Sequence, residues 1–289
     1  MTVEKRTEEL TVHLCPACRH RCAVHENGGA LSADYHSQYD QGIYVDSLER
    51  TRRRQARLIM ATLTGLGIAP DHLIDFGAGR GWFLSEIQKN GASALAGADT
   101  SDLSLKTVQS MGIETAGIQI EQEKLMVDLS SLSFQPTTLS LLDVIEHFPV
   151  SSLENYMRAL LDLLPRARWV IVKVPMAEGI LFRIARLFSA MGWNKPYHQL
   201  FQVGTFPPHF HYFSKRSLEI FLSKFDIRPR RVIDDPDIDD LLGRIKISGK
   251  PFAWASKMIT ALFSLLGKIF STDSRIVIGE RGAAAAPTR

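Results

Sequence analysis

The sequence predicts an α/β protein in which a mostly parallel sheet carries helices on both faces. Two observations support this fold class. Short apolar segments alternate with longer amphipathic segments from about residue 46 to residue 224, as expected for strands that alternate with helices. In addition, the apolar pair Leu73-Ile74 leads into a glycine-rich turn at 77–81, and a helical pattern follows that turn. Such strand–turn–helix units build doubly wound, Rossmann-like sheets.

The predicted elements follow one another in a regular order. A first helix is expected at 46–66, where leucine and isoleucine recur among arginines at helical spacing. Further strands are expected at 72–76, 94–99, within 115–128, within 139–149, and at 169–174, 226–233 and 275–279. Further helices are expected at 80–89, 102–111 and 151–164, and a last one follows Ser214 and ends at residue 224. The carboxyl ends of parallel strands form the ligand-binding edge of such a sheet.

The turn at 77–81 predicts a nucleoside site. Gly77, Gly79 and Gly81 allow positive φ angles and a close approach of the backbone to a ligand. Asp99 ends the next strand, where a carboxylate can accept hydrogen bonds from a ribose diol. The dinucleotide pattern G-x-G-x-x-G would place its third glycine at Trp82, which is too bulky. Because the turn also carries the negative charge of Asp75, we expect a ligand with a cationic rather than a phosphate group.

At these residues the chain resembles the class I S-adenosylmethionine-dependent methyltransferases, whose first motif is similar to residues 75–81. The segment His211-Tyr212-Phe213-Ser214 resembles an element of a bacterial subgroup that includes ubiquinone-biosynthesis-type O-methyltransferases. The resemblance implies a seven-stranded sheet that ends in an antiparallel pair, and S-adenosylmethionine as cofactor. It implies cofactor contacts for Asp75, Gly77, Ala78, Gly79, Gly81, Asp99, Thr100, Asp128, Leu129 and Asp143. Within this set, Asp75 would organise the ammonium group, Asp99 the ribose and Asp128 the adenine.

The candidate chemical site is the segment Asp143-Val-Ile-Glu146-His147. In a helical turn these three polar side chains share one face. The resemblance places the segment beside the transferred methyl group, so Glu146 and His147 are the predicted catalytic residues, with His147 as a general base. A divalent cation is the alternative, because ubiquinone-type and small-RNA 2′-O-methyltransferases show a similar E-x-x-E-H face; the missing ligand would be His209 or His211. A purely structural hydrogen-bonded pair is the third interpretation.

The three cysteines, Cys15, Cys18 and Cys22, lie within eight residues of one another. A Cys-Pro-x-Cys turn directs two thiolates at one metal ion, and His13, His20 or His25 offers a fourth ligand. We therefore predict a structural zinc site formed by Cys15, Cys18, Cys22 and His25. Unligated thiols are the alternative. The spacing C-x2-C-x3-C is the reverse of the radical-enzyme motif C-x3-C-x2-C, which argues against an iron–sulfur cluster. Members of the resembled subgroup often carry a second Cys-x-x-Cys pair, which is absent here.

Composition indicates a cytoplasmic enzyme. The 289 residues include 34 Lys and Arg against 31 Asp and Glu, a net charge of +3 that argues against nucleic acid as the partner. No apolar run follows the first Met, and no uncharged run is long enough to span a bilayer. We expect a Cys/His-rich knot at 1–30, a methyltransferase domain at 40–281 with insertions at about 176–210 and 237–271, and a disordered tail at 282–289.

The two insertions bear on the acceptor. Residues 178–191 and 252–270 predict helices that are apolar around most of their surface, with narrow basic or polar stripes. Such helices either pack on each other as a lid over the site, or lie on the inner face of the membrane. In the second case they would admit a lipid-linked acceptor.

The resulting hypothesis is methyl transfer from S-adenosylmethionine to oxygen of a small or lipid-linked acceptor. The alternatives are a sugar or nucleotide-sugar methyltransferase, a nucleic-acid methyltransferase and a non-catalytic binding module.

Overall fold

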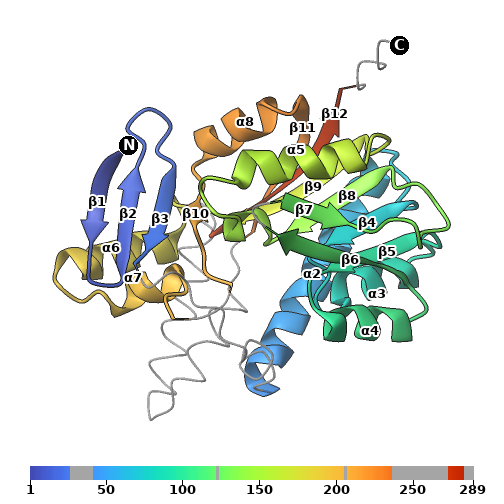
Figure 1. Cartoon of the computed structure of the whole chain (residues 1–289), viewed down its shortest axis with the longest axis horizontal. Coiled ribbons are helices and arrows are strands. Elements are labelled where there is room, and N and C mark those ends of the chain that lie inside the picture. The colour runs from blue at the N-terminus through green and yellow to red at the C-terminus, as the bar shows by residue number, and fades with distance from the viewer. Residues whose placement is uncertain (27–41, 122–123, 205–206, 236–272, 283–289) are drawn as a thin grey trace.

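The computed structural model describes residues 1–26, 42–121, 124–204, 207–235 and 273–282. Figure 1 shows a large sheet with helices on both sides and a small N-terminal sheet beside it. The predicted helix at 252–270, the tail beyond residue 282 and the second insertion lie outside the described residues.

The described residues form a central sheet in the order β11-β12-β9-β8-β4-β5-β6-β7. Its strands are β4 (Leu73–Phe76), β5 (Leu95–Asp99), β6 (Glu114–Glu121), β7 (Lys124–Val127), β8 (Thr138–Leu142), β9 (Trp169–Pro175), β11 (Ile227–Asp235) and β12 (Ser274–Arg281). The five strands from β9 to β6 are parallel, whereas β12 runs antiparallel to both β9 and β11. The antiparallel final pair implied by the resemblance is therefore present.

The predicted single strand within 115–128 is a hairpin of two strands. The first half of β6 pairs in parallel with β5, from Glu114 to Gly117. The second half extends beyond β5 and pairs with β7, with Ile118 opposite Val127. This hairpin gives eight strands in the described central sheet rather than the expected seven.

Helices cover both faces of the central sheet, as predicted. On one face lie α2 (Gly42–Gly65), α3 (Trp82–Lys89) and α4 (Asp102–Ser110), which bury Ile59, Leu84 and Val108. On the other face lie α5 (Leu153–Leu163) and α8 (Lys215–Ser223), which bury Leu160 and Phe221. The alternation of side chains along β4 separates these two cores, because Leu73 belongs to the first and Ile74 to the second.

The N-terminal residues form a meander that is built into the rest of the fold. Strands β1 (Thr2–Arg6), β2 (Leu10–Leu14) and β3 (Arg21–His25) are joined by β10 (His211–Tyr212), which pairs with β3. One face of this sheet packs on α6 (Ile180–Ala190) and α7 (Lys195–Leu200), which occupy the first predicted insertion (Figure 1). The predicted knot therefore shares a sheet with residues far along the chain.

None of the helices in the described part of the chain combines the length and the apolar character that a bilayer span needs.

Candidate functional site

The glycine turn after β4 has the backbone that the sequence predicts. Gly77, Gly79 and Gly81 have φ angles of 77°, 53° and 69°. The Gly77 N–H donates to Ala98 O on β5 at 2.7 Å. A Cβ atom at Gly77 would lie 2.7 Å from Val144 Cγ2, so space as well as backbone conformation requires glycine there. A Cβ atom at Gly79 would meet no atom within 4 Å, so the backbone at Gly79 is open to a ligand.

Asp99 lies directly against this turn. Its Oδ2 atom accepts a hydrogen bond from Gly79 N–H at 2.8 Å, and Oδ1 accepts one from Ser101 N–H at 2.9 Å. Each carboxylate oxygen can accept a further bond, so Asp99 can hold the turn and a ligand hydroxyl together. The next residue, Thr100, is exposed beside it. These positions suit an adenosine ribose placed over the open backbone of Gly79.

Asp75 is buried beneath the turn. Ser140 Oγ donates to its Oδ1 atom at 2.6 Å. Burial raises the pKa of Asp75 to about 7, against the opposing effects of Ser140 and Arg52. A cationic group beside it would favour the ionised carboxylate, so the predicted ammonium partner is chemically suitable.

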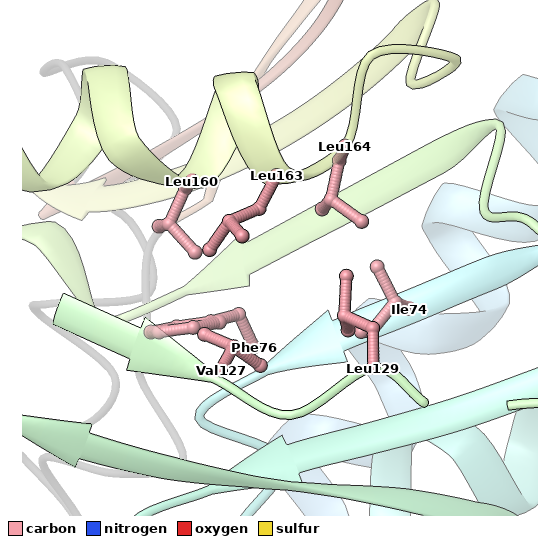
Figure 2. A pocket seen from close by; sticks show the side chains of 7 residues that line it. All are labelled: Ile74, Phe76, Val127, Leu129, Leu160, Leu163 and Leu164. Carbon is pink, nitrogen blue, oxygen red and sulfur yellow. The ribbon is translucent and has the colours of Figure 1, made fainter. Parts of the chain in front are cut away.

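The opposite face of β4 is entirely apolar. Figure 2 shows a pocket beneath α5 into which Ile74 and Phe76 point, together with Leu129. Its full lining is Ile74, Phe76, Val127, Leu129, Leu160, Leu163 and Leu164. No polar group lines this pocket, so it offers no chemistry. The side chain of Leu129 thus packs in the core, while Asp128 is exposed and its Oδ1 atom accepts hydrogen bonds from the N–H and hydroxyl of Ser130.

Asp143 directly follows β8 and links it to two other elements. Its carboxylate forms ion pairs with Arg52 of α2 and with Lys173 of β9, the latter at 2.8 Å. Although burial acts in the opposite direction, the two cations hold the pKa of Asp143 well below its usual range. Its φ angle is 56°, a strained value for a residue with a side chain. These partners give Asp143 a structural role, and its predicted contact with the cofactor remains a prediction.

Glu146 lies in a 3₁₀ turn that spans Ile145–His147 and is labelled η1. Its side chain is 1% exposed, and neither carboxylate oxygen has a hydrogen-bond partner among the other described residues. Burial, and then repulsion from Asp143, raise the pKa of Glu146 well above its ordinary value. A buried carboxyl group of this kind requires either a proton or a bound cation.

His147 is held in one tautomer. Its Nδ1 atom lies 2.8 Å from Pro208 O. A carbonyl oxygen only accepts, so Nδ1 carries the proton and Nε2 keeps its lone pair. Burial lowers the pKa of His147, which favours the neutral ring at pH 7. His147 therefore has the protonation state that a general base needs.

His209 completes the cluster. Its ring lies 4.7 Å from that of His147, and the Gln202 amide approaches its Nε2 atom at 3.0 Å. Ligand atoms of Glu146, His147 and His209 all lie within 4.8 Å of one another. One carboxylate and two imidazoles form a suitable donor set for a divalent cation, and the carboxylate without a partner fits such an ion.

His211, the other predicted ligand, is engaged elsewhere. Its Nε2 atom donates to Phe148 O, and its Nδ1 atom lies 3.0 Å from His20 Nε2. Burial lowers the pKa of His211 to about 3, so this ring is a neutral structural group.

Of the predicted zinc ligands, Cys15 and Cys18 lie within hydrogen-bonding contact of each other, whereas His25 lies apart from them. Cys15 and Cys18 occupy the turn between β2 and β3, and Cys22 is buried on β3. His25 lies at the other end of β3, opposite Leu10, and its Nε2 atom donates to His209 O at 3.0 Å. No cysteine belongs to a three-ligand group in the described residues. His25 is the last residue of β3, three positions after Cys22 and seven after Cys18, so the strand carries its side chain away from the cysteine turn. A structural zinc site stays a prediction.

Two cations of the site escaped sequence analysis. Arg52 lies in the helix predicted at 46–66 and Lys173 in the strand predicted at 169–174, and neither pattern assigns these side chains a role in the site. A lysine inside a buried strand needs an acidic partner, and that rule would have pointed to Asp143.

Comparison with known families decides the class. A family model described as a methyltransferase domain matches residues 48–229, which is more than half of the chain. The chain belongs to this methyltransferase family. No protein of curated function matches the methyltransferase in sequence.

Solved structures agree with the fold. The methyltransferase is similar to magnesium protoporphyrin IX methyltransferase from Synechocystis PCC 6803 with bound SAH, at 15% identity and a TM-score of 0.51. The match covers 88% of this chain and 96% of that chain. A SAM-dependent methyltransferase from Archaeoglobus fulgidus matches at 14% identity and a TM-score of 0.44, over 78% of this chain and 94% of that one. At 15% identity, the likeness to the Synechocystis structure establishes the fold alone.

Replacing Asp143 tests the ion-pair cluster. Asp143→Asn removes the carboxylate that faces Arg52 and Lys173. We expect a loss of about 2 kcal/mol in the free energy of unfolding, less than for a fully buried pair because Asp143 is partly exposed. Urea denaturation measures it, with Asp102→Asn on exposed α4 as the control. A loss no larger than that of the control would show that the cluster contributes nothing.

Replacing Glu146 tests its raised pKa. Above the ordinary pKa of 4.5 the unfolded chain releases this proton while the folded protein keeps it, so folding loses stability as pH rises. Glu146→Gln removes this loss. Its stability relative to the parent protein should therefore increase from pH 5 to pH 8, by at most about 1.4 kcal/mol per pH unit.

Thermal melts in the presence of a chelator measure this difference, with the exposed Glu219→Gln as the control. A difference that stays constant with pH would contradict the assignment.

Proposed function

We propose that the methyltransferase transfers the methyl group of S-adenosylmethionine to an oxygen atom of a small or lipid-linked acceptor. The observation that carries the proposal is the contact between the two halves of the site. Val144, two residues before Glu146, lies so close to Gly77 that a Cβ atom there would overlap it. The glycine turn and the pair Glu146–His147 therefore follow two adjacent strands, β4 and β8, and His209 joins the pair from the segment before β10.

The cofactor half of the proposal rests on chemical fit. When bound, S-adenosylmethionine supplies an electrophilic methyl group on a sulfonium ion. Asp99 would accept the ribose hydroxyls, and the open backbone at Gly79 would lie against the amino-acid portion. Asp75 would meet the ammonium group, which compensates its burial. The residues present thus support binding of the ribose and of the amino-acid portion, and the adenine contact predicted for Asp128 stays a prediction.

The acceptor half rests on His147. A hydroxyl group must lose its proton as it takes a methyl group, and a neutral imidazole with an available Nε2 lone pair can accept it. The bond from Nδ1 to Pro208 O orients the ring and stabilises the imidazolium that forms. Alignment of acceptor and methyl group, with exclusion of water, supplies most of the remaining acceleration.

A divalent cation is the second candidate for the same cluster. Glu146, His147 and His209 would hold it, and such an ion lowers the pKa of a hydroxyl that it binds. The two candidates differ in a measurable way. A chelator would abolish activity if the cluster works through a metal, and would leave it intact if His147 is itself the base.

Labelled S-adenosylmethionine and cell extract divided into lipid, polar-metabolite and RNA fractions test the proposal. We expect label in the lipid or polar-metabolite fraction. His147→Gln should reduce that transfer about 100-fold while the affinity for the cofactor stays unchanged, because the residue acts on the acceptor. The parent rate should fall only on the acid side of pH 6.5, since burial lowers the pKa of His147.

His198→Gln, on α7 and partly exposed, is the matched control. Label confined to RNA would overturn the acceptor class. Full transfer by His147→Gln would exclude His147 as the base.

A further inference from the structure

The end of α6 and the turn to α7 expose three large apolar side chains together. Leu187 is 61% exposed, Met191 65% and Trp193 55%. We call these three residues, with the nearby cations Arg183, Arg186 and Lys195, the α6 tip. The described part of the chain leaves the apolar members of this tip uncovered, so they are available to a partner.

The geometry of α6 explains the exposure. Phe182, Ala185 and Ser189 recur at helical spacing and face the buried core beneath the N-terminal sheet. Leu187 and Met191 are four residues apart, so they lie on one side of the helix end, and both are exposed. Trp193 is held in place by an edge contact with Phe188, at 4.9 Å between ring centroids and 63° between planes. The tip is therefore an ordered surface.

The chain segment that carries the tip has charge of one sign, and the acidic side chains that approach it, Glu4 and Glu9, belong to the N-terminal meander. Residues 179–218 contain no Asp or Glu, while they include two lysines and three arginines. Arg183, Arg186 and Lys195 are all exposed. Arg186 approaches the N-terminal sheet at Glu4, at 3.5 Å. A partner for this surface must accept both apolar side chains and positive charge.

We propose that the α6 tip docks the protein on the surface of an anionic lipid bilayer. Leu187, Met191 and Trp193 enter the interfacial region, where tryptophan is favoured, and the three cations meet lipid phosphates. Docking of a second copy on the same surface is disfavoured, because it would bring like charges together. The proposal deepens the proposed function, on which it rests, by selecting the lipid-linked acceptor.

The tip is physically connected to the candidate site. Phe201, which directly follows α7, accepts a hydrogen bond from His209 N–H at 3.1 Å through its carbonyl oxygen. The next residue, Gln202, contacts the His209 ring. A bilayer that contacts α6 and α7 would therefore lie next to the residues that hydrogen-bond to His209.

Sedimentation with vesicles tests the proposal. The protein should bind vesicles of phosphatidylcholine with phosphatidylglycerol, bind those of phosphatidylcholine alone far more weakly, and lose binding as salt increases. The triple variant Leu187→Ser, Met191→Ser, Trp193→Ser should lose at least about tenfold in affinity. The double variant Arg183→Glu, Lys195→Glu should lose the preference for the anionic lipid. Leu103→Ser, on α4 and 54% exposed, is the matched control.

Thermal melts establish that each variant is folded, and binding of S-adenosylhomocysteine is measured on the same samples. Equal binding of both vesicle types, or unchanged binding of the triple variant, would overturn the proposal. So would a dimer that the triple variant dissociates, because the tip would then join two copies. Loss of vesicle binding with intact S-adenosylhomocysteine affinity separates failure of this inference from failure of the proposed function.

Discussion

The closure of the glycine turn onto the ends of β5 and β8 is the constraint on which the site depends. Gly77 N–H is fixed to Ala98 O, and Gly79 N–H to the Asp99 carboxylate. Val144 fills the space that a side chain at Gly77 would need. These contacts bring three strand ends together, so a ligand that meets Asp99 and Gly79 lies beside the segment that carries Glu146 and His147. The positive φ angles are tolerated because glycine has no Cβ atom.

The second half of the site is supported from the N-terminal sheet. Ala23 N–H on β3 donates to Phe210 O, and Phe210 N–H donates to Glu146 O at 2.7 Å. His25 donates to the carbonyl oxygen of His209. The meander at residues 1–26 thus positions both Glu146 and His209 through a continuous path of hydrogen bonds. On the opposite side, Asp143 with its two cations fixes the end of β8. Burial, and then repulsion from Asp143, raise the pKa of Glu146 against the opposing effect of the two cations.

Local patterns predicted much of the fold and part of the site. The spacing of glycines with Asp99 predicted the turn, because backbone conformation and carboxylate position are local consequences of a strand and its turn. The pair Glu146 and His147 was predicted from the resemblance and from the shared face of a helical turn, and its catalytic role stays a prediction. The other members of the site depend on pairing between strands that lie far apart in the sequence. His209 joins the cluster and His211 leaves it because β10 adds to the N-terminal sheet, a contact between residues almost 190 positions apart. The same pairing draws His25 to His209 and away from the cysteines.

The central claim is that adenosine binds at the ends of β4 and β5. Calorimetric titration with S-adenosylhomocysteine, on the parent protein and on Asp99→Ala, tests it most directly, with Asp102→Ala on α4 as the control. The account predicts one site per chain, affinity equal to the parent in Asp102→Ala, and a loss of at least about tenfold in Asp99→Ala, because a hydrogen bond to a charged group contributes about 1.5–3 kcal/mol. No binding by the parent protein, or full affinity in Asp99→Ala, would contradict it.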